Sequence, residues 1–306
     1  MHPLARNNGR LAGYVSAFKV GEGNYPAAHA EQVLRGGNQP GRRESLALRP
    51  RDCRRGCYPG GARAGHNDAM SELWEGAAVA AQTLLIDADD TLWENNIYFE
   101  QVFEEFVRLV DHPQLSAGQI RAVLDEIECA NRVTHGYGAL SFAHNLRQCY
   151  ERLIGSPPQA GASSAIEAMT RRIFEQPIQL LPGVAETLPY LARRHQLILF
   201  TKGQPDEQRG KIERSGLACY FRHSAVVREK DAAAYRGLVR ELDLAPASVW
   251  MIGNSPRSDI NPALEVGLNA VYIPHPRTWS LEHEPIRNGR GRLLVLESFS
   301  QLRHYF

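Results

Sequence analysis

LLIDADDTLWE, residues 84–94, places three carboxylates within four positions, directly after an apolar run. The run Leu84 to Ile86 is typical of a parallel strand that is covered on both faces. Asp87, Asp89 and Asp90 would repel one another there unless a positive group lay among them. The stretch therefore predicts a buried strand whose carboxyl end holds a cation.

Four further apolar segments are predicted to be strands, and helical segments separate them. The strands are expected at 196–201, 224–227, 249–253 and 269–273, and the helices near 184–194, 206–215, 232–242 and 261–266. Alternating strands and helices indicate an α/β fold, with a doubly wound parallel sheet and a Rossmann-like core. The stretch between the first two strands shows only helical periodicity, so it is interpreted as an inserted all-helical domain.

The predicted domain bounds follow from these patterns. Residues 70–94 and 177–306 form the core, and residues 95–176 form the helical insertion. Residues 1–69 differ from the rest of the chain in composition, with 11 basic residues, 5 acidic residues and 11 glycines. We expect this leader to be disordered or to be upstream sequence translated from a start site placed too early. A basic arm and a targeting peptide are the alternatives.

Polar residues follow the predicted strands at the points where each strand ends. Ligands of doubly wound sheets bind outside the carboxyl ends of the strands, where the strand order reverses. Six side chains are therefore expected to meet at one edge: Asp87, Asp89, Thr201, Lys230, Asn254 and Asp259.

This set of side chains suits magnesium and a phosphate group. Magnesium needs only a few protein oxygens, and Asp87, the backbone carbonyl of Asp89, and Asn254 or Asp259 are its expected ligands. Asp87 is the candidate nucleophile that attacks phosphorus. Asp89 is the candidate acid that protonates the leaving alcohol and the base that later activates water.

These motifs resemble those of the haloacid dehalogenase superfamily, on its phosphatase branch. Asp87-Ala88-Asp89-Asp90-Thr91 matches the first motif, and LFTKG at Thr201 matches the second. Lys230 in VVREKD matches the third, and GNSPRSD, residues 253–259, matches the fourth. Two positions depart from the pattern: Asp90 stands where many members have glycine, and Asn254 replaces an acidic residue.

The resemblance implies that the helical insertion is a cap that closes over the site and contacts the substrate. Within it, the stretch THGYGALSF, residues 134–142, is interpreted as a loop that brings Tyr137 to the site, although an ordinary turn between helices would look the same. Thr201 and Lys230 are expected to assist catalysis. Thr91 and Lys202 are expected to contact the substrate. The stretch IPHPRTWSLEHE, residues 273–284, is predicted to be a surface loop and not a second metal site.

The formal net charge of +1 gives no general reason to expect nucleic acid or a membrane surface as a partner. We therefore expect a cytoplasmic, magnesium-dependent phosphatase, monomeric or homodimeric, that acts on a small phosphorylated metabolite. A 2-haloacid dehalogenase is one alternative. The other is a non-catalytic regulator that binds a phosphorylated ligand, for which the neutral side chain of Asn254 is the argument.

Overall fold

The computed structural model describes residues 81–306, so the predictions for the leader lie outside the described residues. The described chain contains a six-stranded parallel sheet in the order β3-β2-β1-β4-β5-β6. Its strands are β1 (Thr83–Ile86), β2 (Gln196–Lys202), β3 (His223–Val227), β4 (Val249–Gly253), β5 (Asn269–Tyr272) and β6 (Leu293–Val295). The predicted α/β fold with a parallel sheet is confirmed.

Strand β1 lies at the centre of the sheet, because Ile86 is in register with Leu199 of β2 on one side and with Ile252 of β4 on the other. The chain extends the sheet from β1 through β2 to β3, and then returns to β4 and continues to β6. The strand order therefore reverses between β1 and β4, which is where a ligand site is expected in such a sheet.

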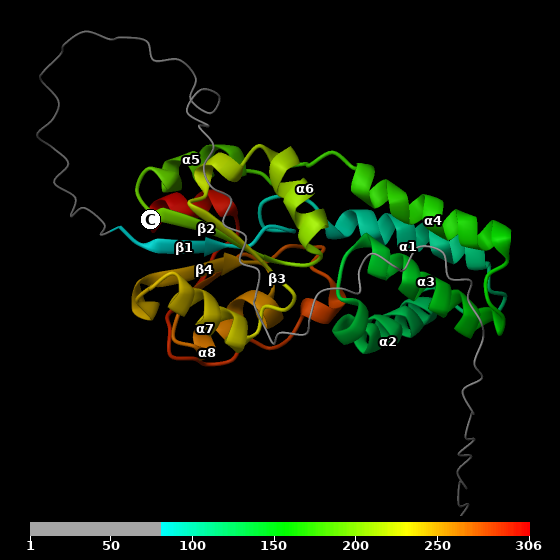
Figure 1. Cartoon of the computed structure of the whole chain (residues 1–306). Coiled ribbons are helices and arrows are strands. Elements are labelled where there is room, and N and C mark those ends of the chain that lie inside the picture. The colour runs from blue at the N-terminus through cyan, green and yellow to red at the C-terminus, as the bar shows by residue number, and fades with distance from the viewer. Residues whose placement is uncertain (1–80) are drawn as a thin grey trace, which may run out of the picture. The chain divides into compact units, whose positions relative to one another are not determined.

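Helices cover both faces of the sheet (Figure 1). On one face, α5 (Val184–Ala192), α6 (Pro205–Ser215) and the C-terminal turn Phe299–His304 pack on a cluster that includes Leu84 and Ile86. On the other face, α7 (Ala232–Glu241) and α8 (Asn261–Glu265) pack on a cluster around Leu85. Alternate side chains of β1 thus enter opposite halves of the core, as the pleat of a strand requires.

Four helices lie between β1 and β2: α1 (Asn96–Val110), α2 (Ala117–His135), α3 (Ala139–Ile154) and α4 (Ala160–Glu175). Their apolar faces form a hydrophobic cluster of their own, in which Phe106, Leu124, Leu146 and Ile166 are fully buried. A capping box at Ser116 and Gln119 fixes the start of α2. No helix within residues 81–306 combines the length and apolar character that a membrane crossing requires.

Candidate active site

Asp87 continues the central strand beyond its last ladder residue, because its backbone N–H donates to the carbonyl of Ile252 at 3.0 Å. The side chain is buried, with one carboxylate oxygen bound by Lys230 and the other accepting a hydrogen bond from Thr91 Oγ1 at 3.1 Å. Burial raises the pKa of Asp87 to about 7, against the opposing effect of Lys230 and with a further contribution from Asp259. A second positive charge at Asp87 would therefore be favourable.

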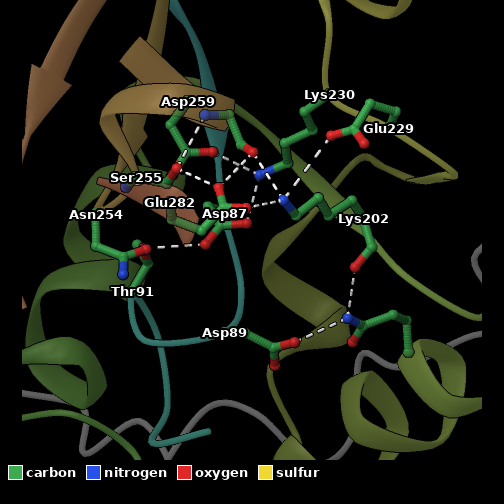
Figure 2. A network of polar contacts seen from close by, with 12 residues as sticks. Asp87, Asp89, Thr91, Lys202, Glu229, Lys230, Asn254, Ser255, Asp259 and Glu282 are labelled. Carbon is green, nitrogen blue, oxygen red and sulfur yellow. Dashed lines mark hydrogen bonds and ion pairs between the residues drawn. The ribbon is translucent and has the colours of Figure 1, made fainter. Parts of the chain in front are cut away.

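Lys230 joins two carboxylates in the buried floor of the site (Figure 2). Its ammonium group contacts Asp87 and lies 2.7 Å from Asp259 Oδ1. Burial alone would lower the pKa of Lys230, but Asp259 and Asp87 outweigh it, and the pKa lies above its ordinary value. The lysine is therefore charged and offsets one of the two negative charges.

Asp259 approaches the backbone closely because residue 253 is glycine. A Cβ at Gly253 would lie 2.2 Å from Asp259 Oδ2, a distance at which another side chain would clash. Asp259 Oδ2 accepts the backbone N–H of Ser255 at 2.9 Å. Both oxygens of Asp259 thus already have donors, which suits a residue that positions Lys230. Its predicted role as a metal ligand stays a prediction.

The donor set beside Asp87 fits magnesium. Thr91 Oγ1 lies 3.1 Å from Asp87 Oδ2 and 3.2 Å from Asn254 Oδ1. A hydroxyl carries one hydrogen, so it can donate to only one of these two buried oxygens at a time. The oxygen without the hydrogen needs another positive partner, and hard oxygen ligands of this kind are those that magnesium prefers.

Thr201 lies at the end of β2 and lines the same cavity as Asp87. It is 1% exposed, and its hydroxyl makes no hydrogen bond with another residue in the described part of the chain. It is therefore available for a ligand oxygen. Thr91 is also buried but does not line the cavity, and its contacts suit a residue that orients Asp87 and Asn254.

Asp89 lies apart from the Asp87 and Lys230 pair (Figure 2). Lys211 Nζ lies 2.9 Å from Asp89 Oδ2, Gln208 donates to the same oxygen at 2.8 Å, and the Trp93 indole donates to Oδ1 at 2.8 Å. Burial alone would raise the pKa of Asp89, but Lys211 and these hydrogen bonds outweigh it, and the pKa is lowered. Asp89 is therefore held as a carboxylate.

Asp90 explains the first departure from the motif. Its backbone has φ = 58°, the left-handed region that glycine adopts freely and that aspartate tolerates better than most residues. Its carboxylate accepts the backbone N–H groups of Asn95 at 2.8 Å and Asn96 at 3.1 Å, and so caps the start of α1. Asp90, Glu94 and His275 also place potential ligand atoms within 4.8 Å of one another.

Lys202 is held by groups from three parts of the chain. Its ammonium group pairs with Glu282, donates to Ser258 Oγ at 2.8 Å, and lies 4.5 Å from the ring centroid of Tyr137. The Tyr137 hydroxyl in turn donates to Glu229 Oε2 at 2.5 Å. Tyr137, from the helical insertion, and Lys202, from the sheet, both line the cavity. Their substrate contacts remain predictions.

The prediction of a surface loop at 273–284 is wrong for two of its residues. Thr278 and Glu282 are buried, and both line the cavity with Trp279. Glu282 accepts hydrogen bonds from Ser255 and Ser258 and pairs with Lys202, which together lower its pKa against the effect of burial. The prolines and charges of the stretch are typical of exposed loops, but these partners make burial of Glu282 possible.

One cavity of about 150 Å³ connects the carboxyl ends of the strands to the helical insertion. From the core it is lined by Asp87, Thr201, Lys230 and Asn254, and from the insertion by Glu128, Arg132 and Tyr137, among others. The sequence reasoning missed Lys211, Gln208, Glu128 and Arg132. The first two lie on α6 shortly after Thr201, a position that could have indicated them.

The model of the haloacid dehalogenase-like hydrolases matches residues 81–267, more than half of the chain. The chain belongs to this family. A solved hydrolase of the family from Xanthomonas campestris is 29% identical, with a TM-score of 0.65, over 76% of this chain and 92% of that one. A family hydrolase from Bacillus subtilis, solved with magnesium, has a TM-score of 0.52 at 16% identity, over 74% of this chain and 99% of that one. That likeness supports the fold.

A phosphoserine phosphatase from Thermus thermophilus is 29% identical to this haloacid dehalogenase-like hydrolase over 133 residues. The match covers 42% of this chain and 52% of the relative, so it spans about half of that enzyme's length.

Proposed function

We propose that this hydrolase removes phosphate from small phosphomonoesters, with magnesium as cofactor and Asp87 as nucleophile. The proposal rests on the buried carboxylate of Asp87, which lies where the strand order of the sheet reverses. Lys230 and Thr91 bind this carboxylate at the wall of the cavity. The partial match to a phosphoserine phosphatase supports phosphomonoesters as the substrate class.

The first half-reaction joins Asp87 to phosphorus. An oxygen of Asp87 attacks the phosphoryl group, the bond from phosphorus to the leaving oxygen breaks, and an aspartyl-phosphate forms. Lys230 offsets negative charge at the attacking carboxylate, and the Thr201 hydroxyl, which has no partner within residues 81–306, donates to a phosphate oxygen. When magnesium is bound by Asp87, the Asp89 carbonyl and Asn254, it supplies electrostatic stabilisation of the charge on the phosphoryl oxygens.

The second half-reaction restores Asp87. Asp89 is held ionised by Lys211, which is the form that a base needs to accept a proton from the attacking water. To protonate the leaving alcohol in the first half-reaction, Asp89 has to leave Lys211 and take up a proton from solvent, which it then passes to the leaving oxygen. The contact with Lys211 therefore determines whether Asp89 can act as an acid or as a base.

Phosphate release tests this function most simply. The purified chain is assayed with p-nitrophenyl phosphate and a panel of small phosphomonoesters, with magnesium and with a chelator, beside Asp87→Asn. We expect turnover that needs both magnesium and Asp87. Halide release from 2-haloacids without phosphate release would favour a dehalogenase. Binding of phosphorylated ligands without turnover would favour a non-catalytic regulator.

A further inference from the structure

Two oppositely charged residues of α2 line the part of the cavity that the proposed phosphoryl chemistry does not use. Glu128 and Arg132 are four positions apart, which places them on the same side of the helix on successive turns. They do not form an ion pair with each other. Each therefore keeps capacity for another partner.

Glu128 is buried, with 7% of its surface exposed, yet its Oε2 atom has no hydrogen-bond partner in the described part of the chain. The side chains of Trp279 and Arg121 lie near the carboxylate and act to lower its pKa against burial, but Arg121 is already engaged. Arg121 pairs with Glu100 at 2.7 Å and stacks at 3.5 Å over the Phe103 ring. A buried carboxylate oxygen without a donor is costly, so this oxygen marks a place for a ligand that donates.

The positively charged side chain of Arg132 also lacks a partner among the described residues. Among residues 81–306, five cationic side chains line the cavity, and four of them pair with carboxylates: Arg121, Lys202, Lys211 and Lys230. The guanidinium of Arg132 makes no ion pair or hydrogen bond with any residue between 81 and 306. Guanidinium groups suit carboxylates, because two parallel N–H groups match two oxygens.

We infer that the substrate's end remote from phosphorus carries a carboxylate bound by Arg132 and a neighbouring hydrogen-bond donor bound by Glu128. This inference rests on the proposed phosphatase function and narrows its substrate class to phosphorylated small acids. An ammonium group and a hydroxyl group would both satisfy Glu128. An amino acid phosphate and a hydroxy acid phosphate are therefore the two sources of this chemistry.

Four substrates separate the contribution of the carboxylate from that of the hydrogen-bond donor. O-phosphoserine carries both groups, with ammonium as the donor, and 3-phosphoglycerate carries both, with hydroxyl as the donor. Phosphoglycolate has the carboxylate without the donor, and O-phosphoethanolamine has the ammonium without the carboxylate. The comparison of the first two probes tells which donor Glu128 prefers.

Arg132→Met should lower kcat/KM for O-phosphoserine relative to O-phosphoethanolamine by about 10- to 100-fold, because one charge-assisted contact is lost. Glu128→Gln should lower kcat/KM for O-phosphoserine relative to phosphoglycolate. Matched controls are Arg108→Met and Glu104→Gln on α1, where both side chains are exposed and do not line the cavity. The controls should leave both ratios unchanged, and thermal melting checks that every variant is folded.

Ratios in Arg132→Met and Glu128→Gln that stay within about twofold of the wild-type ratios would overturn the inference, because a lost charge-assisted contact is worth more than that. If the wild-type chain releases no phosphate from p-nitrophenyl phosphate or from any of the four probes, the proposed function fails. Calorimetric binding of O-phosphoserine then decides the inference separately. Binding that weakens in Arg132→Met and not in Arg108→Met would support the subsite, and absent or equal binding would overturn it.

Discussion

Replacing Lys230 by methionine tests whether this ammonium group holds the floor of the site together. The substitution leaves the carboxylates of Asp87 and Asp259 buried without their shared cation. The side chains of Lys230 and Asp259 are each 1% exposed and that of Asp87 is 11% exposed, so solvent compensates poorly for the loss of the ammonium. Removing one partner of a buried ion pair costs about 3–5 kcal/mol, and we expect the free energy of unfolding to fall by that amount at pH 8.

The loss of unfolding free energy in Lys230→Met should be smaller at acidic pH, because Asp87 can then take up a proton. Its folded-state pKa is already raised to about 7, and without Lys230 it must rise further. The folded state then binds a proton more tightly than the unfolded state, so the stability missing at pH 8 is regained as the pH falls below the folded pKa. Urea unfolding at pH 8 and pH 5.5 measures both values.

Two variants control this experiment. Arg209→Met removes an exposed ion pair with Asp206, in which the side chains are 32% and 95% exposed, and should cost less than about 1 kcal/mol. The double variant Lys230→Met with Asp259→Asn removes one of the stranded charges and should recover part of the loss. A loss for Lys230→Met as small as that for Arg209→Met, or a loss that grows in acid, would refute the reasoning.

Three further predictions concern the proton donor, the helical insertion and the leader. Asp89→Asn removes the proposed general acid and base, whose catalysis is typically worth about 10²–10⁴-fold, and should slow poor leaving groups more than nitrophenol; equal defects, with chemistry shown to limit the rate, would contradict its role. Tyr137→Ala should change the ranking of substrates more than the melting temperature, because Tyr137 lines the cavity and contacts Glu229 and Lys202; unchanged selectivity across a metabolite panel would remove it from the substrate site. A chain shortened to begin at Met70 should melt and turn over like the full chain, since the family match begins at residue 81; a large loss of either would give residues 1–69 a structural role.

The sheet could be predicted because its central strands carry a strong local signal. The runs at Leu84 to Ile86 and at Leu197 to Phe200 are buried on both faces and therefore continuously apolar. Strand β6 was not predicted, because Leu293–Val295 is only three residues long and two of its side chains are exposed. Its place in the sheet depends on pairing with β5, which a single sequence does not display.

The site could be predicted only in part, because some of its residues follow from the order of the strands and others depend on contacts between distant segments. Residues that end strands converge by topology, so Asp87, Thr201 and Lys230 could be grouped from the order of the strands along the chain. The partner of Asp89 could not, because Lys211 is 122 positions away and comes from the surface of a helix. The guanidinium of Arg132, which has no partner among residues 81–306, could not be predicted either, because the lack of a partner is visible only in three dimensions.

Trapping the phosphorylated enzyme tests the central claim most directly. Asp89→Asn is mixed with a phosphate-radiolabelled substrate and magnesium, quenched in acid within milliseconds, digested and sequenced by mass spectrometry. Activation of water is slowed in this variant, so the account predicts label that accumulates on the peptide containing residue 87 and that is absent from the double variant with Asp87→Asn. Turnover of the same substrate with no label at Asp87, or full phosphatase activity in Asp87→Asn, would contradict it.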